Sequence, residues 1–260
     1  MTSFDDLMQE GSTETGPPRR ARRRPRRSLG SRLAGGLGEL LITTGVLIAL
    51  FVVWQVWWTD VVANRQAGEA IERWEQDLVD SPEVAGTEQD GPPPEEVTVG
   101  DGEQFATMYV PAWGESWQFP IASGVDYATV LDAGFVGHYA ETALPGQVGN
   151  FGLAGHRQSY GRPFYDVDSL QPGDSIIVRT AQAWYVYEVS DYEVILPHQS
   201  EVLLPVPHEP QTEPTEAMIT LTTCHPLWSI AERYVVYGEL DHWVDPADGR
   251  PEELITNGSQ

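Results

Sequence analysis

The 260-residue chain contains no lysine and only one cysteine, and basic residues of any kind are scarce. One cysteine cannot form an intramolecular disulfide, and no cysteine cluster exists for a structural zinc site. The 15 basic residues are all arginine and face 39 acidic residues, which gives a formal net charge of −24. Such an acidic body repels phosphate backbones, so we expect the folded part not to bind nucleic acid. We also expect no cofactor and no metal site.

The arginines are concentrated before a long apolar run near the N-terminus. Residues 1–36 form a polar tail that includes the sequence RRARRRPRR, and we expect this tail to be disordered. Leu37–Trp58 follows with Glu39 as its only charge, and as a helix it would span about 33 Å, enough to cross a bilayer. Tryptophans near the end of the run are typical of membrane interfaces. The positive-inside rule then predicts a cytoplasmic N-terminus and an extracellular body in the cell membrane.

Other interpretations of the apolar run are weaker. It is too long for an ordinary buried core helix. A cleaved signal peptide would have a shorter apolar core, of roughly 7–15 residues, and a small-residue cleavage site, which Val61-Val62-Ala63-Asn64 matches poorly. The arginine run could bind nucleic acid, but beside a membrane span it is more simply a topology signal that also contacts anionic lipid.

Residues 59–103 have the composition of a stalk. Asn64–Val79 has weak helical periodicity and could continue the membrane helix. Ser81–Gly102 is rich in proline, glycine and acidic residues, a composition that buries too little apolar surface to order itself. We therefore predict a flexible spacer here.

From residue 104 to 246 the chain changes to short apolar runs separated by turn signals, which predicts an all-β domain, either a closed barrel or a sandwich. A C-terminal tail, 247–260, follows. The only helical signals are short, at Glu141–Ala143 and Asp166–Leu170. Nine runs have strand length and are rich in β-branched and aromatic residues: Phe105–Val110, Trp117–Ile121, Ala128–Leu131, Asn150–Ala154, Asp174–Arg179, Trp184–Val189, Glu193–Leu196, Ala217–Thr222 and Arg233–Leu240.

Cys224 is the most informative residue of this domain. A lone cysteine in an exported domain is either a small buried apolar residue or a working nucleophile. The sequence Thr220-Leu221-Thr222-Thr223-Cys224-His225-Pro226 begins as a strand and ends at a proline. The thiol should therefore lie at a sheet edge, where a strand runs out into a loop.

A nucleophilic thiol needs a group that takes its proton. His198 and His208 lie in a proline-rich loop and His242 follows the last strand, so these three are more simply surface residues. His225 adjoins the cysteine, but neighbours in an extended chain point to opposite sides. His138 and His156 remain, and His156 follows an apolar strand, so that two strand ends could bring it beside Cys224.

The oxyanion formed in acyl transfer needs hydrogen-bond donors, and a guanidinium offers five N–H groups. Arg157, Arg162 and Arg233 are candidates. Arg233 starts the strand after Cys224, and antiparallel pairing of the two strands would place it beside the thiol. Arg157 and Arg162 could equally be surface residues.

The motifs resemble those of sortases, the surface-anchored cysteine transpeptidases of Gram-positive bacteria. Thr220–Cys224 followed by Arg233 is similar to the sortase signature. The likeness covers roughly residues 104–245 and includes segments that resemble class E, the housekeeping-type enzymes of actinobacteria: Gly137-His138-Tyr139, Thr142-Ala143-Leu144-Pro145-Gly146, Gly149-Asn150-Phe151, Ala154-Gly155-His156-Arg157 and Thr222-Thr223-Cys224-His225-Pro226. The long acidic loop Pro197–Glu216 departs from the pattern and could reshape substrate access.

The resemblance implies a closed eight-stranded barrel and cleavage of a C-terminal sorting signal between Thr and Gly through a thioacyl enzyme. It implies transfer of the acyl group to a peptidoglycan precursor amine, with Cys224 as nucleophile, His156 as general acid and base, and Arg233 as oxyanion and substrate clamp. Class E enzymes are associated with Leu-Ala-x-Thr-Gly signals rather than Leu-Pro-x-Thr-Gly. The substrate-binding residues that the resemblance implies are Tyr139, Thr222, Thr223 and His225.

Two alternatives belong to other classes. An exported L,D-transpeptidase is also a β-rich cysteine enzyme of the cell wall, but these resemble one another by a His-Gly-Cys arrangement, and here Thr222 and Thr223 precede Cys224. A non-enzymatic surface β-domain would carry an inert buried cysteine. Reactivity of the thiol toward a labelling reagent at neutral pH would separate an inert thiol from an active one.

Overall fold

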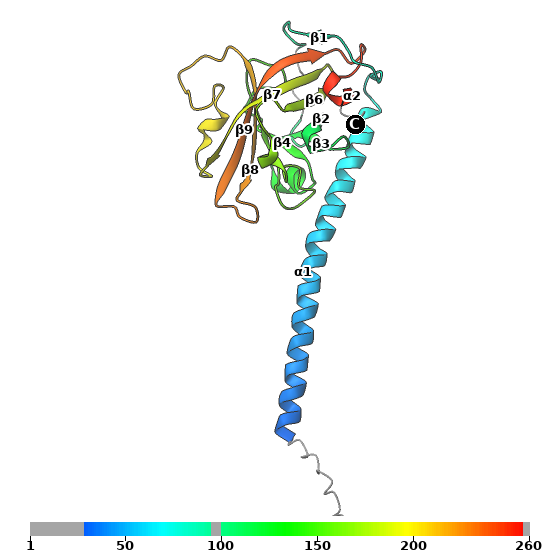
Figure 1. The fold of residues 1–260 in the computed structure, drawn as a ribbon, viewed down its shortest axis with the longest axis vertical. Coiled ribbons are helices and arrows are strands. Elements are labelled where there is room, and N and C mark those ends of the chain that lie inside the picture. Colours follow the sequence, from blue (N-terminus) through cyan, green and yellow to red (C-terminus); the bar gives the residue numbers. More distant parts are fainter. Residues whose placement is uncertain (1–28, 95–99, 257–260) are drawn as a thin grey trace, which may run out of the picture. The chain divides into compact units, whose positions relative to one another are not determined.

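The computed structural model describes residues 29–94 and 100–256, and the chain divides into two units, residues 1–51 and 52–260. The described part of the first unit is helical, and it belongs to a helix α1 that runs over Leu29–Glu75 (Figure 1). Among the described residues, this is the one helix that is long and apolar enough to cross a membrane. The large apolar side chains described between Leu33 and Trp58, such as Leu47 and Phe51, are exposed, as the sequence predicts for a lipid-facing span. Most of the expected N-terminal tail, 1–28, lies outside the described residues.

The second unit is built on a closed β-barrel. Eight strands close in the order β9-β7-β6-β2-β3-β4-β5-β8, with β8 pairing back onto β9, and the two-residue β1 extends the sheet beside β9. This confirms the eight-stranded barrel. The strands are β1 (Glu88–Gln89), β2 (Gln104–Tyr109), β3 (Gln118–Ser123), β4 (Val136–His138), β5 (Gly149–Ala154), β6 (Ser175–Thr180), β7 (Trp184–Ile195), β8 (Ala217–His225) and β9 (Glu232–Val244).

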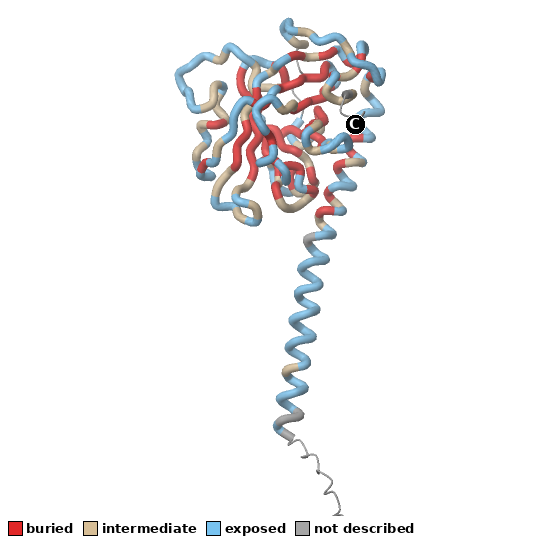
Figure 2. Tube along the Cα trace, in the orientation of Figure 1, coloured by how far each residue is buried: buried red, intermediate tan, exposed pale blue. Residues whose placement is uncertain are grey.

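The short helical elements lie between the strands. They are η1 (Pro111–Trp113), η2 (Tyr127–Leu131), η3 (Val167–Ser169), η4 (Ser200–Leu203) and, after the barrel, α2 (Glu252–Thr256). The main core fills the barrel, and its largest fully buried side chains include Tyr185, Tyr187 and Phe151. Figure 2 shows this burial concentrated on the barrel strands. All six residues of β5 are buried, which makes this strand a rigid support for the loop that comes after it.

Three sequence predictions within the barrel are wrong in detail. Ala128–Leu131, expected as a strand, is part of η2, a π-helical turn. The Asp126 carboxylate accepts hydrogen bonds from the N–H groups of Ala128 and Thr129, so local capping outweighs the strand propensity of these residues. The two runs Trp184–Val189 and Glu193–Leu196 form one strand, β7, with a register shift near Val189. Glu141–Ala143 forms a turn and not a helix.

The described residues of the expected stalk, 59–103, pack on the barrel and do not form a free spacer. The helical continuation that Asn64–Val79 suggested is present, because α1 continues to Glu75, and small side chains at helical spacing, Ala63, Ala67 and Ala70, are buried on the barrel side. Small residues let a helix approach closely, and Ala67 belongs to the main core. The composition of the segment does not predict this packing, because most of the apolar surface that becomes buried in the contact belongs to the barrel and not to the segment.

Residues after α1 are also attached to the barrel by polar contacts. β1 pairs with β9, Trp243 Nε1 donates a hydrogen bond to the carbonyl of Gly91 at 2.8 Å, and Trp184 Nε1 donates to Ser81 Oγ at 3.1 Å. The barrel therefore satisfies backbone and hydroxyl groups that a free spacer would expose to water. The expected C-terminal tail is attached to this same segment, because the Arg250 N–H donates to the carbonyl of Val84 at 2.9 Å.

Candidate active site

The paired ends of three strands define the candidate site. In the antiparallel pair of β8 and β9, Cys224 lies directly opposite Arg233. β5 runs parallel to β8 with Ala154 opposite Thr222, so both strands end at the same end of the barrel. His156 lies two residues beyond Ala154, as Cys224 lies two residues beyond Thr222. The register thus brings Cys224, His156 and Arg233 to one edge of the barrel, as the sequence analysis predicts.

Hydrogen bonds lock the two parallel strand ends at this level. The Gly155 N–H donates to the carbonyl of Thr222 at 3.2 Å, and Thr223 Oγ1 donates to the carbonyl of Gly155 at 2.7 Å. Thr223 is only 3% exposed. It lies on the opposite face of β8 from Thr222 and Cys224, because successive side chains of a strand alternate. Thr223, for which the resemblance implies substrate binding, therefore ties the loop of His156 to β8 and does not line the face of Cys224.

Cys224 is a free, partly exposed cysteine. The partly exposed Arg233 beside it is oriented by backbone carbonyls, since its Nη1 donates to Ile230 at 3.1 Å and to Glu232 at 2.8 Å. Both bonds are made by Nη1. Because a guanidinium has five N–H groups, the Nη2 side can still donate to a bound molecule. The turn between β8 and β9 also presents the exposed side chains of Trp228 and Ile230.

His156 is held by a set of contacts that the sequence analysis did not foresee. Its Nε2 lies 2.8 Å from Asp132 Oδ1. Its ring stacks on Tyr160, with ring centroids 5.2 Å apart, and meets Tyr127 at 6.0 Å. Tyr127 and Asp132 both belong to η2 or its C-terminal cap. Because η2 was expected to be a strand, no pattern in the sequence linked Asp132 to His156.

Arg157, which could have been a surface residue, is buried. Its Nη2 lies 2.6 Å from Asp168 Oδ2, its Nη1 lies 3.0 Å from Nδ1 of His225, and its guanidinium lies over the ring of Tyr234. Arginine can only donate, so His225 Nδ1 is the acceptor. This contact joins the residue after His156 to the residue after Cys224. His225 therefore supports the site from the face of β8 opposite Cys224.

Tyr139 lies just beyond β4, on the same side as Thr222. Its hydroxyl is 3.1 Å from Thr222 Oγ1. Thr222 Oγ1 donates its single proton to the carbonyl of Leu153 at 3.0 Å, so the Tyr139 hydroxyl is the donor in the contact between them. The phenolic oxygen keeps its lone pairs, and it can accept a hydrogen bond from a bound molecule.

The long loop Pro197–Glu216 packs over the other end of this face. Asn150 Nδ2 donates to the carbonyls of Val202 and Leu204 at 3.0 and 3.1 Å, and Asn150 Oδ1 accepts from Thr220 Oγ1 at 2.7 Å. Thr220, Thr222 and Cys224 alternate along the same face of β8. The loop therefore covers the Thr220 end of the face and leaves the Cys224 end accessible.

Comparison with known proteins decides the family. The model of the sortase domain matches residues 108–241. Sortase SrtE2 of Streptomyces coelicolor is 37% identical over 244 residues, which cover 89% of this chain and 90% of that protein. The chain belongs to the sortase family. Sortase SrtE1 of the same organism is also 37% identical, over 85% of this chain, although the match spans only 60% of SrtE1.

A solved structure supports the same assignment. The SrtA sortase from Actinomyces oris matches with a TM-score of 0.62 and 42% identity, over 64% of this chain and 96% of that one. The sortase-domain match runs from β2 to β9 and contains Cys224, His156, Arg233 and Tyr139. It also contains Asp132 and Arg157, whereas α1 and β1 precede it.

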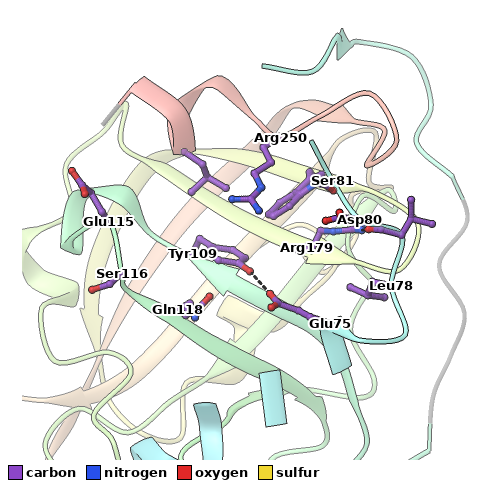
Figure 3. Close-up of a pocket in the computed structure, with 13 residues that line it drawn as sticks. Glu75, Leu78, Asp80, Ser81, Tyr109, Glu115, Ser116, Gln118, Arg179 and Arg250 are labelled. Carbon is purple, nitrogen blue, oxygen red and sulfur yellow. Dashed lines mark hydrogen bonds between the residues drawn. The ribbon is translucent and has the colours of Figure 1, made fainter. Parts of the chain in front are cut away.

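A separate cavity of about 380 Å³ lies where the end of α1 meets the barrel. Figure 3 shows Glu75, Tyr109, Arg179 and Arg250 converging on it. Tyr109 donates a hydrogen bond to Glu75 Oε1 at 3.2 Å, and burial followed by the charge of Glu75 raises the pKa of Tyr109. None of the candidate catalytic residues lines this cavity. In residues 29–94 and 100–256, no three His, Cys, Asp or Glu side chains are close enough together to hold a metal ion.

Proposed function

We propose that this sortase is a transpeptidase that cleaves a C-terminal sorting signal between Thr and Gly and joins the new end to a cell-wall amine. The observation that carries the proposal is the register at the sheet edge. Cys224 lies opposite Arg233 across β8 and β9, and His156 follows the strand that runs parallel to β8. A nucleophile, a proton-transfer group and a cation then share one site, as acyl transfer requires.

In the acylation half of the reaction, His156 takes the proton of the Cys224 thiol, and the thiolate attacks the carbonyl carbon of the signal's Thr. Arg233 donates N–H groups to the oxyanion that forms. The C–N bond to Gly then breaks, and His156 gives its proton to the leaving amine. The product is a thioester between Cys224 and the Thr acyl group.

In the transfer half, an incoming amine attacks the thioester carbon and gives a proton to His156. The C–S bond breaks, a new amide forms, and the sulfur regains the proton. We propose that the amine belongs to a peptidoglycan precursor. This acceptor is consistent with an anchoring role for Leu37–Trp58 that keeps the barrel at the outer membrane face, with the N-terminus in the cytoplasm.

Tyr139 supports a preference for Ala over Pro at the second position of the signal. Its hydroxyl donates to Thr222 and keeps acceptor capacity. An Ala in the signal has a backbone N–H that can donate to this oxygen, whereas Pro has none. Leu-Ala-x-Thr-Gly is therefore the favoured signal, and Leu-Pro-x-Thr-Gly the poorer one.

The proposal is tested with the purified full-length chain in detergent, incubated with each signal peptide and with an added amine. Mass spectrometry should detect cleavage between Thr and Gly, the amine-linked product, and a thioacyl adduct on Cys224. Cys224→Ala is the matched control, because a short side chain at a strand end contributes little to the core. Cleavage by the folded Ala variant, or absence of any adduct on the wild-type chain, would contradict the assignment.

A further inference from the structure

A carboxylate, that of Asp132, lies beside His156. Asp132 caps the C-terminus of η2, and its Oδ1 lies 2.8 Å from His156 Nε2. The adjacent residues Val130 and Leu131 are buried, so η2 is anchored to the barrel. The histidine side chain is 16% exposed and the aspartate side chain 33%. The contact is therefore a half-buried, well-supported pair and not a loose surface contact.

The chemistry of the pair determines which ring nitrogen carries the proton. A carboxylate can only accept hydrogen bonds, so the proton between the two groups sits on Nε2. A neutral imidazole has one N–H and one lone pair, which places the lone pair on Nδ1. Stacking on Tyr160 and contact with Tyr127 restrict rotation of the ring, so this choice of nitrogen is maintained.

We propose that Asp132 is the positioning residue for His156, holding the imidazole so that Nδ1 exchanges protons with Cys224 and with the substrate amine. The inference rests on the proposed function. During acylation the thiol proton moves from sulfur to Nδ1, and the Nε2 proton stays in its hydrogen bond to Asp132. The imidazolium then donates from Nδ1 to the leaving amine, and Asp132 remains ionised throughout. Asp132 thus acts through His156 and does not touch the substrate.

The test is Asp132→Asn in the full-length chain. An amide can accept a hydrogen bond through its oxygen or donate one through its nitrogen, so the variant keeps the shape but permits both tautomers of His156. Nitrogen-15 NMR of histidine-labelled protein at about pH 8 reports the tautomer, and His156→Gln identifies the signal. We expect an Nε2–H tautomer in the wild type and a mixture in the variant. With the peptide substrate, kcat should fall by about 10–100-fold while KM changes less than about twofold.

Asp126→Ala is the matched control, because it removes the side-chain cap at the other end of the same η2 and Asp126 does not contact His156. If Asp132 only stabilised η2, both variants would lose the same activity, and the proposal would be wrong. An unchanged tautomer in Asp132→Asn would overturn it as well. The NMR readout does not depend on turnover. A wild-type chain with the expected tautomer but no peptide cleavage would therefore reject the proposed function and leave the Asp132–His156 assignment standing.

Discussion

The groups of the candidate site are supported in two different ways. Cys224 and Arg233 lie on regular strands, and their relative position follows from one antiparallel ladder. His156 lies on a loop beyond β5, and its ring is held by side chains, Asp132 at the end of η2 and Tyr160 in the same loop. The loop is in turn attached to α1, because Asp60 accepts a hydrogen bond from the Gly161 N–H at 3.3 Å and pairs with Arg162 at 3.1 Å.

The difference shows where tolerance to substitution should lie. A ladder of backbone hydrogen bonds is insensitive to most side chains, so the strand-borne pair should keep its geometry in many variants. A loop that is positioned by side chains loses precision when any one of them is changed, and small displacements at a catalytic group are costly. The proposed proton-transfer group is therefore the more easily disturbed half of the site.

The largest loss of activity is expected from removing either the loop-borne His156 or the strand-borne Arg233. Arg233→Ala should lower kcat/KM by about 10²–10³-fold, the usual loss when an oxyanion donor is removed, and His156→Ala by about 10²–10⁴-fold, the usual contribution of a general acid and base. Because the two groups serve one transition state, the double variant should lose much less than the product of the single losses. Peptide-cleavage kinetics on all three variants measure this, and a fully multiplicative loss would contradict a shared role.

The same comparison explains how much could be predicted from the sequence. Alternating apolar residues in β7 and the run Thr220–Cys224 carry strand signals that are local, so an all-β domain, Cys224 and its partner Arg233 could be predicted, whereas the choice of a closed eight-stranded barrel rests on the resemblance to sortases. Asp132 could not, because the capping by Asp126 that creates η2 outweighs a strand-like composition. The burial of Arg157 and the attachment of α1 through Asp60 also depend on contacts between segments far apart in the chain.

A smaller effect on activity is expected from a substitution of Tyr139, which directly follows the strand β4. Tyr139→Phe removes the phenolic oxygen that we propose accepts the N–H of Ala in the signal. The preference for the Ala peptide over the Pro peptide should fall by about 1–2 kcal/mol in relative kcat/KM, and turnover of the Pro peptide should change less. An unchanged ratio would make Tyr139 a packing residue and direct attention to the loop Pro197–Glu216.

A substitution of Asp60 tests how far the position of His156 depends on contacts between its loop and α1. Asp60→Asn keeps the side-chain shape but removes the charge that pairs with Arg162, and we expect a loss of about 1 kcal/mol in the free energy of unfolding. Because the run Tyr160–Arg162 carries the ring that stacks on His156, kcat should also fall severalfold. Glu69→Gln is a suitable control, since Glu69 pairs with Arg65 on the exposed side of the same helix. Equal losses of activity in both variants would argue against a specific route through Asp60.

The smallest effect concerns His138, at the end of β4, and it appears as a pH dependence of stability. His138 is 2% exposed, and its ring lies against Phe105 and Phe151. Burial lowers the pKa of His138, and hydrogen bonds to Ala143 and Thr142 offset this only in part. In the unfolded chain His138 therefore becomes protonated near pH 6.5, whereas in the folded chain His138 is still neutral at that pH. The contribution to stability is present above about pH 6.5 and is lost as the pH falls below it.

Chemical denaturation of the wild-type chain at pH 7.5 and pH 5.5 should show this loss, and the share from His138 should be at most about 1 kcal/mol. His138→Gln keeps a side-chain donor for the carbonyl of Ala143 but cannot be protonated, so its stability should fall less over the same pH range. Because His138 lies on the regular strand β4, the variant should keep the geometry of the site and retain kcat for peptide cleavage at pH 7.5. A pH dependence identical to that of the wild type would show that other groups account for the acid sensitivity.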